Sequence, residues 1–249
     1  MTPQRPAARR ALLLAALAQL AGPLRAEDAG LRLVSADFPP LLSASDKQGG
    51  PLGELLQKLG EQAGFNLKPE FYPFARALLL ARNGPGVLMA PVGRTPDRET
   101  QYRWLLPLYT QRYHLLSRHD RWPSPPPLAE LRYRKVLVLR GSISTQSLRR
   151  QGFQNIREES NYETILRRLD EGSADLAYGS QIVIHGALHS SGRHEGDYQL
   201  GQSFDSTEVW LVGSPDVSDV QAQALQAAME RLRADGSLQQ FLNKIGLAR

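Results

Sequence analysis

The chain has 249 residues, with 30 Lys+Arg against 25 Asp+Glu and no cysteine. The lack of cysteine excludes disulfides, thiolate metal sites, cysteine nucleophiles and a lipid-modified cysteine. Four arginines and no acids fall in residues 1–26, so the remainder has 26 Lys+Arg, 25 Asp+Glu and a formal net charge of +1. A nucleic-acid-binding protein is far more basic, so we expect no nucleic-acid partner.

The N-terminal segment is first basic, then apolar, then rich in small residues. Arg5, Arg9 and Arg10 precede an apolar run at 11–21, and Ala26 precedes the first acids. This order is typical of a secretory signal peptide, and the run is shorter than the roughly 20 residues that span a bilayer. We therefore predict cleavage after about Ala26 and a periplasmic location. An uncleaved membrane anchor is the alternative.

A first series of strands and helices follows this segment. Short apolar runs predict strands, and apolar residues at helical spacing between them predict helices. The expected strands are 31–35, 65–71 and 87–92, and the expected helices are 52–63 and 73–82. Strands that alternate with helices indicate parallel βαβ units.

A second series begins after the proline-rich segment 122–127. The expected strands are 135–139, 155–157 and 174–178, with one helix ending near Gln151 and another capped by Asn161. Two helices end the chain, at 218–233 and 238–245, and Ser218 with Gln221 forms a capping box for the first. Each α/β series is small for an independent domain.

Several segments, taken in order, resemble one protein family. They are Asp37-Phe38-Pro39-Pro40, 53–56, 72–78, 94–99, 106–109, 140–142, 171–175 and 234–238. This ordered set is similar to the amino-acid-type (family 3) extracellular solute-binding proteins of ABC importers, and Thr95-x-x-Arg98 is its sharpest element. The resemblance covers essentially all of the chain after residue 26.

The resemblance implies an α/β class protein with a two-lobed type II periplasmic-binding-protein fold. In this fold, two α/β sheets are joined by a two-strand hinge. The implied divisions are a signal peptide at 1–26, lobe 1 at 27–111 and 213–249, and lobe 2 at 112–212, with crossover strands near 111–117 and 208–213.

Arg98 is the first candidate for binding a ligand. A guanidinium stays charged and can hold a carboxylate through two parallel hydrogen bonds. In the family, the arginine at this position binds the ligand's carboxylate. Thr95 belongs to the same segment, and Gly93 lies just before it. The alternative is a surface arginine paired with Asp97 or Glu99.

The other candidates come from both predicted lobes. The turn after strand 135–139 exposes main-chain N–H groups to an anion, and the family uses this turn for the same carboxylate. Phe38 takes the place of the family's aromatic lid. The further candidates are Asp37, Tyr72, Arg76, Ser142, Ile143, Ser144 and Ser180. Each has a structural alternative, such as a core position for Phe38 or a helix cap for the serines.

Three positions depart from the family pattern. Pro91 and Gly93 stand where hydroxyl residues usually precede the arginine element. Ser180, five residues after Asp175, stands where the family usually places the acid that holds the ligand's ammonium group. A neutral residue does not compensate a buried ammonium. We therefore predict a ligand with an anionic group that is not a standard α-amino acid, although Asp37 is an alternative source of the missing charge.

Residues 94–157 carry thirteen Lys+Arg and four Asp+Glu. A solvated basic face is the simpler interpretation of this stretch, and a cleft whose field attracts anions is the alternative.

The resemblance implies a monomeric binding protein for a small carboxylate-bearing solute, with an inner-membrane ABC permease as partner and with no enzymatic activity and no cofactor. A dehydratase-like enzyme on the same fold is one alternative, with Asp37 and Glu208 as its acid or base. A sensor that docks on a membrane receptor is another. His185 and His189, with His194-Glu195 nearby, permit a metal site, but Gly186 and Gly192 argue against the one rigid helix it needs.

Overall fold

The computed structural model describes residues 30–122, 124 and 126–247. The predicted signal peptide therefore lies outside the described residues. From Leu31 onward the chain forms one compact unit. Within the described ranges, none of the helices has the length and hydropathy needed to span a bilayer.

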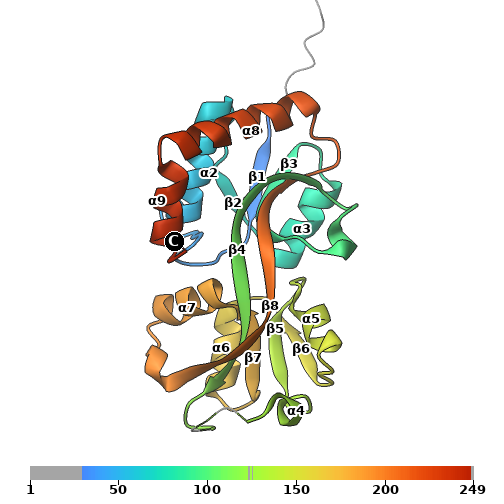
Figure 1. Ribbon diagram of the computed structural model, residues 1–249, viewed down its shortest axis with the longest axis vertical. Coiled ribbons are helices and arrows are strands. Elements are labelled where there is room, and N and C mark those ends of the chain that lie inside the picture. Colours follow the sequence, from blue (N-terminus) through green and yellow to red (C-terminus); the bar gives the residue numbers. More distant parts are fainter. Residues whose placement is uncertain (1–29, 123, 125, 248–249) are drawn as a thin grey trace, which may run out of the picture. The chain divides into compact units, whose positions relative to one another are not determined.

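Two groups of three parallel strands lie at the two ends of one eight-stranded sheet (Figure 1). The first group is β2 (Pro69–Phe71), β1 (Arg32–Ser35) and β3 (Val87–Gly93). The second group is β7 (Leu176–Ser180), β5 (Val136–Leu139) and β6 (Ile156–Glu159). We call the parts of the molecule built on these groups the first lobe and the second lobe.

Two long antiparallel strands connect the lobes. They are β4 (Arg103–Arg118) and β8 (Tyr198–Gly213), each of 16 residues, paired along their length. β8 pairs with β3 of the first lobe, and β4 pairs with β7 of the second. The strand order is therefore β2-β1-β3-β8-β4-β7-β5-β6. The chain passes from the first lobe to the second along β4 and returns along β8.

Helices cover the parallel strands of each lobe (Figure 1). The first lobe carries α2 (Gly50–Ala63), α3 (Phe74–Asn83), α8 (Asp219–Ala234) and α9 (Ser237–Lys244). The second lobe carries α4 (Leu128–Leu131), α5 (Ser144–Arg150), α6 (Tyr162–Asp170) and α7 (Gln181–Ser190). Two short 3-10 turns are η1 (Pro96–Arg98) and η2 (Glu195–Asp197).

Burial explains why the short strands form. All four residues of β5 are buried, as are all seven of β3. Parallel strands covered on both faces are continuous apolar runs for this reason. The largest buried cluster occupies the first lobe and continues into the second, and a smaller cluster around Tyr178 fills the rest of the second lobe.

The predicted α/β fold class is confirmed, and so are two predicted helix starts. The Asn161 side chain accepts a hydrogen bond from the Thr164 N–H at the start of α6, and Ser218 and Gln221 form a reciprocal capping box on α8. The crossover strands are longer than predicted, and α7 was not predicted. The lobe boundaries after residues 111 and 212 stay a prediction, because β4 and β8 pass through them without a break.

One sequence argument was wrong. Gly186 does not interrupt a helix, because α7 is continuous through it. A Cβ added at Gly186 would lie 2.4 Å from the Pro39 carbonyl oxygen. The glycine is therefore needed because the second lobe lies so close to the first at this point. Its backbone has the conformation of a regular helix, so the lack of a side chain matters and the conformational freedom of glycine does not.

Candidate functional site

Arg98 lies at the end of the η1 turn, directly after β3 of the first lobe. Its Nη1 donates a hydrogen bond to the Gly93 carbonyl at 3.1 Å, and its Nη2 donates to the Gly141 carbonyl at 2.5 Å. Gly141 follows β5 of the second lobe, so the guanidinium bridges the two lobes. Burial lowers the pKa of Arg98 from its usual value, but arginine stays protonated in proteins.

The Gly141 turn approaches the first lobe closely. Gly141 has φ +78°, and a Cβ added to it would lie 3.2 Å from the Cα of Ala75 in α3. A left-handed backbone and this short distance both favour glycine. The turn therefore presents its carbonyl to Arg98 at a point where the lobes are in contact.

A small cavity surrounds the Arg98 guanidinium, and we call it the inner cavity. Its volume is about 40 Å³. It is lined by Phe38, Phe74, Pro91, Gly93, Arg98, Gln111, Tyr113, Leu139, Ser142, Ile143, Tyr162, Ser180 and Val183. Because pockets for small ligands usually measure about 300–1,000 Å³, the lobes must separate to admit any but the smallest solute.

Arg98 is the one charged side chain among the described residues that line the inner cavity. The other polar groups are neutral. The Gln111 Nε2 donates to the Tyr113 hydroxyl at 2.6 Å, and burial raises the pKa of Tyr113 well above its usual value. The Ser180 Oγ is buried and has no hydrogen-bond partner among the described residues. The lining therefore offers one positive charge and several neutral hydrogen-bonding groups.

A larger groove adjoins the inner cavity, and we call it the outer groove. Its volume is about 710 Å³, and it runs along the loops after β1 and β2 of the first lobe and after β6 of the second. Its lining includes the carboxylates of Asp37 and Glu163 and the Tyr72 ring. Residues of both lobes line the groove, so it lies between them.

Three aromatic rings line both spaces and separate them. The Phe38 ring lies 5.7 Å from the Phe74 ring and 6.4 Å from the Tyr162 ring, measured between centroids, and meets Tyr162 edge to face. Both geometries are favourable for aromatic pairs. Phe38 and Phe74 belong to the first lobe and Tyr162 to the second, so separation of the lobes would open a path between groove and cavity.

Comparison with solved structures identifies the architecture. An ancestral arginine-binding protein bound to glutamine superposes with a TM-score of 0.75, at 18% identity, over 88% of this chain and 98% of that chain. A histidine kinase sensor domain with similarity to periplasmic binding proteins gives 0.76, at 18% identity, over 87% and 95%.

A third structure is an ancestral amino acid-binding protein described as a precursor of cyclohexadienyl dehydratase. It superposes with a TM-score of 0.73, at 16% identity, over 86% of this chain and 94% of that chain. The fold is that of the two-lobed periplasmic binding proteins. Comparison with protein-family models finds no match, and neither does comparison with curated proteins.

The periplasmic-binding-protein fold brings most of the sequence-predicted residues to the cleft. Those that line the inner cavity are Phe38, Gly93, Arg98, Ser142, Ile143 and Ser180, and those that line the outer groove are Asp37, Phe38 and Tyr72. Thr95, Ser144 and Arg76 line neither space. Arg76 instead places its guanidinium over the Tyr72 ring, 5.4 Å from the centroid.

Three polar residues that line the inner cavity were missed by the sequence analysis. Gln111 and Tyr113 lie two apart on β4, so both side chains point to the same face of the sheet. That alternation in the predicted crossover strand was the available signal. Nothing in the sequence marked Tyr162 as a lining residue. It follows the Asn161 cap and reaches the cavity because α6 packs against the cleft.

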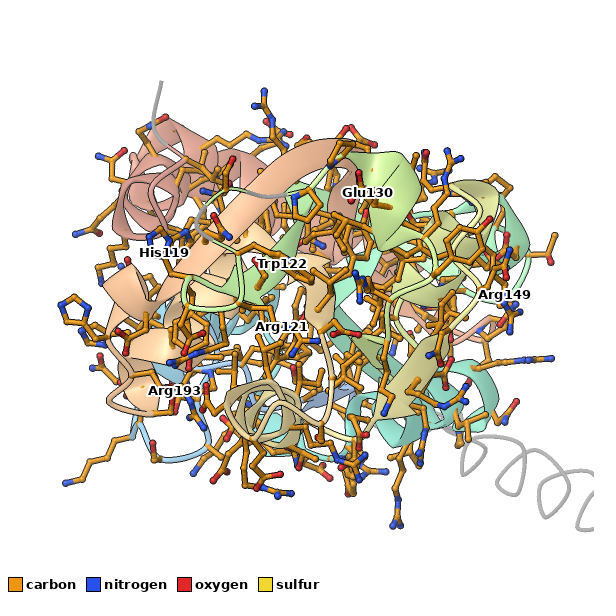
Figure 2. All side chains as sticks on the ribbon, turned by 90° about the horizontal axis from the view of Figure 1, so that it is seen from below. His119, Arg121, Trp122, Glu130, Arg149 and Arg193 are labelled. Atoms are coloured by element: carbon orange, nitrogen blue, oxygen red, sulfur yellow. The ribbon has the colours of Figure 1, made fainter. Side chains whose placement is uncertain are left out.

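The basic stretch 94–157 is mostly a solvated face of the second lobe. Among the described residues, Arg98 is the one basic residue of this stretch that lines the inner cavity or the outer groove. Two others, Arg121 and Arg149, which are labelled in Figure 2, are exposed. The Arg121 guanidinium lies 5.7 Å from the centroid of the Trp122 ring.

Of the histidine candidates for a metal site, His185 lies beside an acid. His185 Nδ1 lies 3.0 Å from the Glu195 Oε1. No group of three or more potential metal ligands occurs among the residues that the structure describes.

Proposed function

We propose that this chain is an exported solute-binding protein that captures a small carboxylate-bearing solute between its lobes. The supporting observation is Arg98, a partly buried guanidinium whose hydrogen bonds within the described residues go to two neutral carbonyls, one in each lobe. A carboxylate can accept two parallel hydrogen bonds from a guanidinium and also carries the opposite charge. A carboxylate that enters when the lobes part therefore binds the guanidinium better than the neutral Gly141 carbonyl does.

The neutral lining argues for a simple anion and against a standard α-amino acid. Ser180 carries no charge, and no acid lines the inner cavity among the described residues. An ammonium group brought beside Arg98 would be buried without a counter-ion, and this is costly. The proposed solute is therefore a carboxylate without an α-amino group, although the arginine-binding neighbour was bound to glutamine.

Binding without turnover fits the lining better than catalysis does. A general acid or base works best with a pKa near the working pH. In the inner cavity, burial raises the pKa of Tyr113 and Tyr162 well above the usual tyrosine value, and Arg98 stays charged. The likeness to a dehydratase precursor keeps an enzyme as the alternative.

The transport role is also part of the proposal. We infer a periplasmic monomer, cleaved after about Ala26, that delivers its solute to an ABC permease. The likeness to a histidine kinase sensor domain favours docking on a membrane receptor as the alternative. Co-purification with a permease on solute addition would support import, and co-purification with a receptor would support sensing.

The test is a thermal-shift screen of the chain from residue 27, unfolded and refolded to remove retained solute. The panel contains amino acids, amines, non-amino carboxylates, phosphates and sugars. A ligand at 100 times its Kd stabilises the folded protein by about 2.7 kcal/mol, a visible rise in Tm. A rise with non-amino carboxylates alone supports the proposal. A rise with standard amino acids, or no rise with carboxylates, contradicts it, and consumption of the bound compound would favour the enzyme.

A further inference from the structure

A bidentate ion pair closes the loop that carries Arg98. Arg94 precedes the η1 turn and Glu99 follows it. The Arg94 Nε donates to the Glu99 Oε2 at 3.1 Å, and its Nη2 donates to the Glu99 Oε1 at 2.5 Å. The loop therefore has its two ends fixed to each other, with Arg98 one residue before the second end.

The Arg94 guanidinium also lies against two tryptophans, one from each crossover strand. Its Cζ is 5.2 Å from the centroid of Trp104 on β4 and 4.6 Å from the centroid of Trp210 on β8. The two indole rings meet edge to face at 6.0 Å. A planar guanidinium can stack on aromatic rings while its N–H groups bind a carboxylate, and a lysine ammonium cannot do both.

Hydrogen bonds to main-chain groups of the same loop attach it to the crossover strands. The Arg94 N–H donates to the Glu208 carbonyl at 3.0 Å, and the Thr207 hydroxyl donates to the Arg94 carbonyl at 3.1 Å. At the other end, the Trp104 Nε1 donates to the Glu99 carbonyl at 3.2 Å. One end of the loop is thus bound to β8 and the other to β4.

We propose that Arg94 is a positioning residue, which orients Arg98 for its anion and ties the anion site to both strands of the hinge. This inference rests on the proposed function. The pair itself is partly exposed, with 36% of the Arg94 side chain and 46% of the Glu99 side chain accessible. Exposed pairs contribute little to stability. Loss of Arg94 should therefore change the geometry of Arg98 far more than the melting temperature.

The first experiment needs no ligand. Wild-type protein is treated briefly with phenylglyoxal, an arginine-specific reagent, and the rate of modification of each arginine is measured by peptide mass spectrometry. In Arg94→Lys, which keeps the charge, we expect Arg98 to be modified several-fold faster, because the loop no longer holds it between the Gly93 and Gly141 carbonyls. Glu99→Gln should give a smaller increase.

The matched control is Arg32→Lys. Arg32 forms the same kind of bidentate pair with Glu70, at 3.0 and 2.6 Å, between β1 and β2 of the first lobe. This variant should leave the Arg98 rate unchanged. An equal Arg98 rate in wild type and Arg94→Lys, or an equal increase in both Lys variants, would overturn the positioning role.

The second experiment uses the carboxylate that gives the largest thermal shift. Calorimetric titration of Arg94→Lys should show at least about a tenfold weaker Kd, or ~1.4 kcal/mol, with a Tm close to that of wild type. An unchanged Kd would contradict the inference even if the proposed function holds. If wild type binds no carboxylate, the proposed function fails, and the modification rates alone decide whether Arg94 positions Arg98.

Discussion

The Arg98 guanidinium of the first lobe donates a hydrogen bond to the Gly141 carbonyl of the second lobe, at 2.5 Å. This contact crosses the cleft in which the proposed solute binds. It makes the closed arrangement of the lobes and the anion site depend on the same side chain. The acceptor is neutral, so a carboxylate would compete with it for the guanidinium.

Replacement of Arg98 by alanine should abolish carboxylate binding while the fold stays intact. Truncating one partner of a buried charged pair costs about 2–5 kcal/mol. Calorimetry measures the binding, and far-UV circular dichroism checks the fold. Arg140→Ala is the control, because it removes the same charge from an exposed position that lines neither the cavity nor the groove. Normal carboxylate binding by Arg98→Ala would refute the site assignment.

Replacement of Gly186 by alanine should hold the lobes apart. The added Cβ would lie 2.4 Å from the Pro39 carbonyl oxygen and 2.6 Å from the Pro40 Cδ, both in the first lobe. Within α7 alone, alanine is favoured over glycine by about 1 kcal/mol, so the second lobe should tolerate the change. Small-angle X-ray scattering should show a larger radius of gyration than in wild type.

Gly201→Ala is the control for that measurement. Its Cβ would make only an ordinary contact, 3.5 Å from the Leu115 Cβ. We expect its radius of gyration to match that of wild type. If Gly186→Ala also matched wild type, the Pro39 contact would not govern how the lobes meet.

Thermal stability should fall in acid. Among the described residues, hydrogen bonds lower the pKa of five carboxyl groups, those of Glu70, Glu99, Asp120, Asp216 and Asp235. The unfolded chain then binds more protons than the folded one at low pH, so stability rises with pH in that range. We expect Tm to be nearly constant between about pH 5 and 8 and to decline below about pH 4.

Glu70→Gln tests the origin of this decline. The Glu70 carboxylate accepts hydrogen bonds from Arg32 and from the Tyr72 hydroxyl. Its loss should cost about 0.2–1 kcal/mol near neutral pH, as for other exposed pairs. The difference between the variant and wild type should shrink as the pH falls and Glu70 becomes protonated. A difference that does not depend on pH would contradict this account.

Removal of the capping box on α8 should destabilise the first lobe. The Ser218 Oγ accepts from the Gln221 N–H at 3.2 Å, and the Gln221 side chain accepts from the Ser218 N–H at 2.9 Å. Ser218→Ala should lower the free energy of unfolding by about 0.5–2 kcal/mol, measured by urea denaturation. Ser218→Gly should cost only a few tenths, because glycine is itself a tolerated cap.

Local sequence signals predicted much of the fold. The strands β1, β3, β5 and β7 are short apolar runs, and α2, α6 and α8 have apolar residues at helical spacing with identifiable caps or glycine ends. These signals work because each element's own residues decide its periodicity and its ends. Arg98 became a candidate differently, because an ordered set of segments resembles a protein family and places an arginine there.

The sequence by itself determined the alternation of strands and helices, the absence of cysteine chemistry and the arginine available for an anion. Only the tertiary structure decided that Gln111, Tyr113 and Tyr162 share the inner cavity with Arg98, because strand pairing and helix packing bring them together from distant parts of the chain. The tertiary structure also decided that residues 181–190 form the helix α7, which lies between β7 and the loop of Pro39. A helix that is buried on several sides lacks the one-sided apolar pattern by which a helix is recognised in a sequence.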